Sequence, residues 1–122
     1  MILTDTSVWV GHLRVGTPAL VRALDSGQVL AHPHVIGELA CGNLRNRGGV
    51  LQLLHDLPRA TLATEDEALA CIEQNRLRGR GLGWTDAHLI ASALLTPCQL
   101  WTIDVALARE AGRCGIAVIE DE

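Results

Sequence analysis

The chain has 122 residues with fourteen acidic and ten basic side chains, a formal charge of −4, and neither lysine nor tyrosine. The missing residue types exclude Schiff-base chemistry, a P-loop lysine and a tyrosine acid or base. The acidic balance and the three tryptophans argue against a general grip on nucleic acid, so any such contact must be local.

Length and composition indicate one folded domain over residues 1–122. Apolar residues make up 48 %, which excludes a disordered chain. The four cysteines form no C-x-x-C pair, so a structural zinc site is not expected. The first residues lack a signal-peptide pattern, and no apolar run approaches the ~20 residues of a membrane span. We therefore expect a cytoplasmic protein without disulfides.

Short apolar runs alternate with amphipathic segments along the chain, which is typical of an α/β protein. Strands are predicted at residues 1–4, 28–31, 99–103 and 116–119, with a weaker one at 60–63. Helices are predicted from Thr17-Pro18 to Gly27, at 35–44, at 50–57, after the T-x-x-E capping box at 64–67, at 84–95 and at 105–112. Right-handed crossovers then require a parallel sheet of four to five strands with helices on both faces.

Four acids lie inside apolar segments, whereas most of the others are expected to face solvent. They are Asp5 after M-I-L-T, Glu38 in V-I-G-E-L-A, Asp86 in W-T-D-A-H-L-I-A and Asp104 in L-W-T-I-D. A buried carboxylate needs a partner, no arginine is adjacent to any of the four, and a divalent cation could serve them all. Asp5 and Asp104 end predicted strands, where open α/β sheets form their sites.

Each of these acids also has a simpler interpretation. Aspartate is a favoured N-cap, and Asp5, Asp86 and Asp104 each precede a helical pattern. Glu38 could lie on a solvated helix face. His32 and His34 could join Glu38 in a transition-metal site, but H-E-x-x-H is absent and Pro33 disfavours the geometry. The four acids together make a joint site the better interpretation.

The order of four short motifs resembles one known family. These are D-T-S after the first strand, G-E-L at Glu38, T-D-A-x-x-x-A-x-A at Asp86 and W-T-x-D at Asp104. Together, over the whole chain, they resemble the PIN-domain ribonucleases, and in particular the VapC toxins of VapBC toxin–antitoxin modules. The resemblance implies a Rossmann-like fold and an endoribonuclease dependent on Mg²⁺, for which Mn²⁺ can substitute.

The resemblance also implies roles for individual residues. The acidic quartet maps onto Asp5, Glu38, Asp86 and Asp104 as metal ligands and catalytic residues, with Asp5 and Asp86 the main ligands. Ser7 and Thr102 match positions that help to place metal or water. The bound ion would make hydroxide available to attack phosphorus. The implied partners are RNA, a VapB-type antitoxin covering the active site, and a second copy of the chain.

Two rival functions follow from the same residues. One is a binding domain that keeps the fold and has lost the chemistry, which only activity can exclude. The other is a metal-dependent phosphatase with Asp5 as nucleophile. Such enzymes usually carry a second acid two residues later and a lysine, whereas position 7 is serine and lysine is absent.

The segment R-L-R-G-R-G-L-G lies just before Asp86. Its arginines, Arg76, Arg78 and Arg80, are candidates for contact with RNA phosphates, although a solvated loop at a helix end would look the same. Arg45 and Arg47 are weaker candidates. The three tryptophans lie near Asp5, Asp86 and Asp104, and we expect them to be core residues beside the site rather than base-stacking groups.

Overall fold

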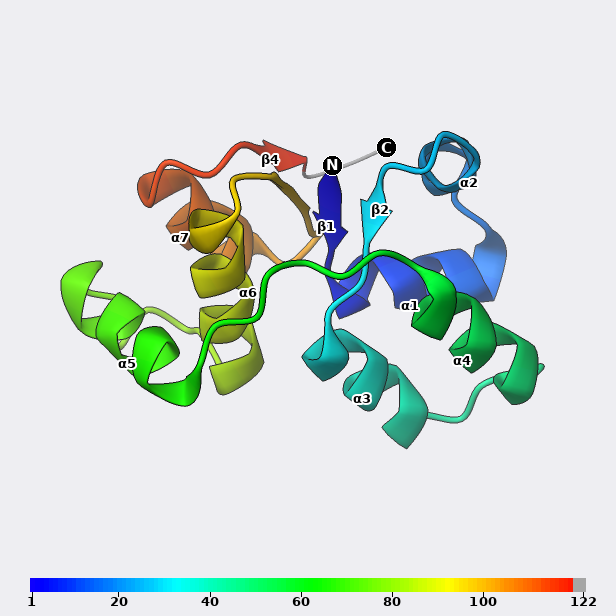
Figure 1. Ribbon diagram of the computed structural model, residues 1–122, viewed down its shortest axis with the longest axis horizontal. Coiled ribbons are helices and arrows are strands. Elements are labelled where there is room, and N and C mark those ends of the chain that lie inside the picture. Colours follow the sequence, from blue (N-terminus) through cyan, green and yellow to red (C-terminus); the bar gives the residue numbers. More distant parts are fainter. Residues whose placement is uncertain (120–122) are drawn as a thin grey trace.

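The computed structural model describes residues 1–119, so the acidic segment 120–122 lies outside the described residues. Within that range strands and helices alternate (Figure 1). The elements are β1 (Ile2–Thr4), α1 (Thr6–Val15), α2 (Pro18–Asp25), β2 (Val29–Leu30), α3 (Pro33–Cys41), α4 (Arg47–Asp56), α5 (Glu65–Gln74), α6 (Trp84–Leu95), β3 (Gln99–Trp101), α7 (Val105–Arg113) and β4 (Val118–Ile119). No helix in residues 1–119 is both long and apolar enough to cross a membrane.

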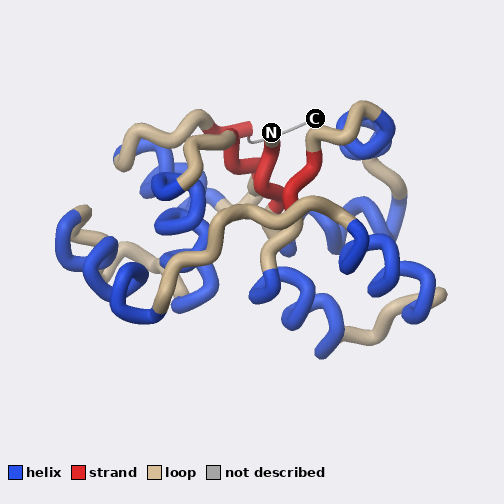
Figure 2. Tube along the Cα trace, viewed as in Figure 1, coloured by secondary structure: helices blue, strands red, loops and turns tan. Residues whose placement is uncertain are grey.

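The four strands form one parallel sheet in the order β2-β1-β3-β4. Leu3 of β1 is paired with Leu30 of β2 on one side and with Leu100 of β3 on the other. Figure 2 shows the strands gathered between the helices, and in Figure 1 α1 to α4 lie on one side of the sheet and α5 to α7 on the other. This confirms the predicted α/β class. The parallel arrangement brings the carboxyl ends of β1 and β3 to the same edge.

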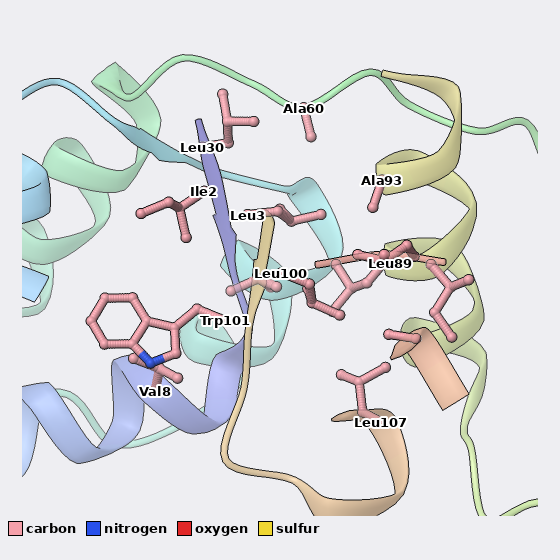
Figure 3. Close-up of a cluster of buried hydrophobic side chains, with 14 of the residues drawn as sticks. Ile2, Leu3, Val8, Leu30, Ala60, Leu89, Ala93, Leu100, Trp101 and Leu107 are labelled. Carbon is pink, nitrogen blue, oxygen red and sulfur yellow. The ribbon is translucent and has the colours of Figure 1, made fainter. Parts of the chain in front are cut away.

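The core lies on both faces of this short sheet, because alternate strand residues point to opposite sides. Leu3 and Leu100 are fully buried, and Figure 3 shows Leu100 between β3 and Leu89 of α6. Trp101 lies on the opposite face beside Val8 of α1. Central strands covered on both faces favour apolar side chains, which explains the apolar runs in the sequence, although Thr4 at the end of β1 is buried as well.

Several predicted boundaries were wrong. Residues 60–63 form no strand: the chain only bridges from Arg59 to Ala31, and two hydrogen bonds, from Ala31 N to Pro58 O and from Ala60 N to Ala31 O, make up that contact. The proline at position 58 lacks an N–H group for a longer ladder. Helix α3 begins at Pro33 rather than at residue 35, because proline suits the first helical turn.

Helix α7 contains a buried charge that the sequence analysis did not single out. Glu110 has no solvent exposure, and it accepts hydrogen bonds of 2.8 Å from Nε of Arg109 and from Nε of Arg113. Nε of Arg80 lies 3.6 Å away. Hydrogen bonds from Arg109 and Arg113 hold the pKa of Glu110 below its ordinary value, and the charges of Arg113 and Arg80 act in the same direction, against the effect of burial.

The lowered pKa of Glu110 predicts an acid-sensitive contribution to stability. Its stabilising effect is fully present above the ordinary pKa of 4.5 and is lost as the pH falls through the lower folded-state value. We expect wild type to be more stable than Glu110→Gln at about pH 7, with the difference shrinking below about pH 4. Thermal unfolding of both proteins across this range tests it, and a difference that does not change with pH would contradict it.

Candidate active site

Asp5 follows β1 and is held by two hydroxyl groups, one from Ser7 on α1 and one from Thr102 after β3. Its Oδ2 accepts hydrogen bonds of 2.7 Å from Ser7 Oγ and of 2.7 Å from Thr102 Oγ1. Both hydroxyls in turn accept backbone N–H groups, Ser7 from Ile103 at 3.2 Å and Thr102 from Asp104 at 3.0 Å. Asp5 is the N-cap residue of α1, but its side chain makes no cap hydrogen bond, so the capping interpretation fails for it.

Asp104 does cap a helix. Its Oδ1 accepts a 3.0 Å hydrogen bond from the Leu107 N–H and so begins α7. Within residues 1–119 its other carboxylate oxygen has no hydrogen bond, so one oxygen is fixed and the other remains available. The capping interpretation and a role in a joint site are therefore compatible for this residue.

Glu38 lies on α3, which packs against α1 at the same edge of the sheet. Its Oε1 accepts a 2.6 Å hydrogen bond from Thr6 Oγ1, the first residue of α1. Thr6 was not singled out from the sequence. The D-T-S motif that contains Thr6 could have indicated it, because Thr6 directly follows Asp5 in the chain and so lies close to the same site.

Asp86 is inside the first turn of α6, not the N-cap residue, and its Oδ2 accepts a 2.9 Å hydrogen bond from the Gly83 N–H. Burial raises its pKa above the ordinary value. The hydrogen bond from Gly83 opposes this shift, while the negative charges of Asp5, Asp104 and Glu38 add to it. The charges of the other three acids all act on Asp86, so the four lie near one another. The expectation that all four are buried was wrong: Asp5 is buried and Asp86 is half-buried, but Glu38 and Asp104 are exposed. We call these four acids the acidic site.

The donor set of the acidic site suits a hard divalent cation. Carboxylate and hydroxyl oxygens surround it, and in residues 1–119 the ion pairs all involve Glu110 rather than these four acids. In the same residues no three histidine, cysteine, aspartate or glutamate side chains are already arranged around one metal position.

The surroundings of the acidic site are partly apolar. Trp9 and Trp101 are buried, as predicted, but Trp84 is 42 % exposed, so the prediction that all three tryptophans belong to the core was wrong for it. Trp84 stacks edge-on against His88, with ring centroids 4.5 Å apart. Ile103 and Val105, on either side of Asp104, are also exposed.

The three arginines before Asp86 are close together but not equivalent. Arg76, Arg78 and Arg80 line one hollow of about 520 Å³ with Ile72 and Glu73. Nε of Arg80 donates to the carbonyl of Arg76. Arg78 makes no hydrogen bond or ion pair in the described part of the chain. Of the weaker candidates, Arg47 donates to the Ala40 carbonyl at 2.6 Å.

Three histidines cluster between α3 and α6, beside the acidic site. The rings of His34 and His88 are 4.3 Å apart, and Nε2 of His32 lies 3.2 Å from Ser92 Oγ. Nδ1 of His32 accepts the His34 N–H, which is the cap of α3. The partners of His32 are therefore a serine and a backbone N–H group, and the alternative of a transition-metal trio with Glu38 has no support in these contacts.

Comparisons with known proteins agree with this geometry. The PIN domain family model matches residues 2–112. Ribonuclease VapC32 of Mycobacterium tuberculosis, in strains CDC 1551 and H37Rv, is 43 % identical over 122 residues, which covers 99 % of this chain and 98 % of that protein.

Two solved structures share the fold. FitAcB from Neisseria gonorrhoeae has a TM-score of 0.65 at 21 % identity, covering 98 % of this chain and 96 % of that one. FitAB bound to an IR36 DNA fragment has a TM-score of 0.61 at 18 % identity, covering 98 % and 94 %.

The chain belongs to the PIN-domain family. Its likeness along the whole length to a VapC protein places it in the VapC group of that family.

The buried His32 leads to a prediction about pH. Burial lowers its pKa from 6.5 to about 4, and the charges of His34, His88 and Arg59 act in the same direction. The unfolded chain therefore binds a proton at His32 below pH 6.5, whereas the folded chain binds it only near pH 4. The free energy of unfolding should therefore decrease as the pH is lowered from 6.5 to about 4. NMR titration of the His32 ring should give a midpoint near 4, and a midpoint near 6.5 would contradict its burial as a neutral ring.

Proposed function

We propose that this chain is a metal-dependent endoribonuclease and the toxin of a toxin–antitoxin pair, acting in the cytoplasm. The observation that carries the proposal is the acidic site. Four carboxylates from four segments lie near enough for the charges of three to raise the pKa of Asp86, and none of them has an arginine partner within residues 1–119. The whole-length likeness to a ribonuclease of the VapC group supports RNA as the substrate class.

In this proposal Asp5, Glu38, Asp86 and Asp104 hold Mg²⁺, for which Mn²⁺ can substitute. The bound ion would lower the pKa of water and offset charge on the scissile phosphate. The expected products are a 5′-phosphate and a 3′-hydroxyl.

The hydroxyls of Ser7 and Thr102 serve to fix Asp5. Both donate to the same oxygen, Oδ2, which leaves Oδ1 of Asp5 free of hydrogen bonds in residues 1–119. The cap of α7 likewise fixes Asp104 through one oxygen. Carboxylates oriented in this way lose less conformational entropy when they bind a ligand, which is the advantage of a preorganised site.

Phosphate contact outside the acidic site is proposed for Arg78, with Arg76 and Arg80 beside it. Their hollow lies where α5 passes into the connection to α6, and Arg80, the last of the three, is six residues before Asp86. An arginine with no intramolecular partner can give its guanidinium to a phosphate without breaking another contact. This supports Arg78 more strongly than Arg80, which lies near Glu110.

A groove next to the acidic site supports an antitoxin as partner. It has a volume of about 560 Å³ between α1 and α3 and ends at Thr6 and Glu38. We call it the α1–α3 groove. Its apolar lining comes from Val10, Leu13, Leu39 and Leu44, and Arg14 and Arg45 flank it. An apolar groove that leads to a catalytic site suits an inhibitory peptide segment, whose end would cover the carboxylates.

A homodimer is the remaining part of the proposal. Val15 at the end of α1 and Val21 on α2 are exposed apolar residues that a second copy could cover. Light scattering of the purified chain decides this point directly.

Removal of one proposed ligand should abolish RNA cleavage. The ion's effect on the transition state is worth several kcal/mol, so we expect Asp86→Asn and Asp5→Asn each to lower the cleavage rate about 100-fold or more. The assay uses end-labelled RNA with Mg²⁺ or Mn²⁺, together with total RNA from a bacterial host after induced expression.

The matched control is Asp66→Asn, the same substitution at an exposed acid on α5 away from the acidic site. This variant should cleave like wild type, and EDTA should stop both. If wild type cleaves no RNA with either metal, the alternative of a non-catalytic binding domain is the better description. Cleavage that persists in EDTA would contradict metal dependence.

The α1–α3 groove makes a separate prediction. Val10→Arg places a charge in its apolar lining, and we expect the Kd for the co-purified antitoxin to rise about 10-fold or more. Leu69→Arg, at an exposed position of α5 outside the groove, is the control and should bind normally. Calorimetry with both variants measures the effect, and equal binding by Val10→Arg would show that the antitoxin lies elsewhere.

A further inference from the structure

The connection from α5 to α6, residues 75–83, is held to α7 by arginine side chains. Nη2 of Arg113 donates to the carbonyl of Asn75 at 2.6 Å and to that of Arg76 at 3.4 Å. Nη2 of Arg109 donates to the carbonyl of Arg80 at 3.0 Å. We call residues 75–83 the α5–α6 segment. Helix α7 thus holds this segment at two places, at Asn75 and Arg76 and again at Arg80.

Glu110 determines where these two guanidinium groups point. It lies between Arg109 and Arg113 and accepts the Nε–H of each at 2.8 Å, one on each carboxylate oxygen. An arginine fixed through Nε presents its Nη groups in a defined direction, because the guanidinium is planar. Glu110 itself has no solvent exposure, so no water replaces these contacts.

The backbone of the α5–α6 segment needs such support. Arg76 has φ of +53°, and Gly79 and Gly81 have φ of +72° and +84°. A left-handed conformation is costly for a residue with a side chain. The segment contains three glycines, which have many accessible conformations in the unfolded chain, so contacts from outside the segment help to hold its ordered conformation.

The ordered segment ends at the acidic site. Gly83, its last residue, donates its N–H to Asp86 Oδ2 at 2.9 Å, which is the one hydrogen bond of that side chain within residues 1–119. Only Gly81 and Leu82 separate this donor from Arg80, whose carbonyl Arg109 holds. A displacement at Arg80 therefore reaches the Gly83 N–H through three peptide units.

We propose that Glu110 is a positioning residue of the acidic site: through Arg109 and Arg113 it fixes the α5–α6 segment and so the Gly83 N–H that orients Asp86. The inference rests on the proposed function in one respect, that Asp86 is a metal ligand. The proposal predicts that substitutions of Arg109 and Arg113 have unequal effects on metal binding at the acidic site. Arg109 acts near Gly83, whereas Arg113 acts at the far end of the segment.

The test uses Glu110→Gln, Arg109→Met and Arg113→Met in the full chain, with Mn²⁺ alone as the probe. Hydrogen exchange reports the ordering of the segment, and a Mn²⁺ titration followed by electron paramagnetic resonance gives Kd. Outer-shell partners of metal ligands change affinity by about 10-fold or more, so we expect that rise in Kd for Glu110→Gln and Arg109→Met, with faster exchange of the amides at 81–83. Arg113→Met should speed exchange at 76–77 with a smaller change in Kd.

Two controls separate positioning from general loss of stability. Leu54→Ala removes a fully buried side chain of α4 without touching the segment, and Asp66→Asn changes an exposed acid at the start of α5. Both should keep the wild-type Kd and the wild-type exchange at 76–83. A Kd raised equally by Leu54→Ala, or a wild-type Kd and exchange in Glu110→Gln, would overturn the proposal.

Failure of the proposed function gives a different result. If wild type does not bind Mn²⁺, the metal site is refuted and with it the positioning of a metal ligand, whatever the exchange data show. If wild type binds Mn²⁺ and only the positioning is wrong, the Glu110 and Arg109 variants bind it equally well.

Discussion

The mutual repulsion of four carboxylates at one edge of a small sheet is the constraint around which the structure is arranged. Burial and the charges of Asp5, Asp104 and Glu38 raise the pKa of Asp86, so the folded chain meets a cost that its core must offset. Neutral donors limit that cost. Hydroxyls hold Asp5 and Glu38, and backbone N–H groups hold Asp86 and Asp104, so within residues 1–119 none of the four is paired with a positively charged side chain.

Glu110, the buried carboxylate of α7, has partners of the opposite kind. Glu110 is surrounded by arginines, and its charge is neutralised inside the protein. The same side-chain type thus serves two purposes that differ only in the partner supplied. Carboxylates without a positively charged partner can bind a cation, whereas a carboxylate paired with arginines fixes the direction of those arginine side chains. Helix α7 carries both, with Asp104 at its start and Glu110 two turns later.

The sequence was informative where structure depends on neighbours along the chain. The capping box of Thr64 and Glu67 and both ends of α6 were predicted correctly, because local hydrogen bonds and apolar periodicity decide them. The placement of Asp5 and Asp104 at one edge followed from the sequence, since the carboxyl ends of the parallel strands β1 and β3 meet there, whereas a shared site with Glu38 and Asp86 stays a prediction. Glu110 was missed because one of its partners, Arg80, lies thirty positions away, although R-E-A-G-R and the apolar Leu107 and Ala111 on its face were visible signals. The exposure of Trp84 depends on packing among helices, which no local pattern encodes.

The uneven burial of the tryptophans gives the protein an optical property. The chain has three tryptophans and no tyrosine, so its near-ultraviolet fluorescence comes from indole rings alone. Trp9 and Trp101 are shielded by the core, whereas Trp84 is open to solvent two residues before Asp86 and touches His88. A soluble quencher would reach Trp84 first. The emission that it removes therefore comes from the start of α6, and the natural chain carries its own spectroscopic label beside the acidic site.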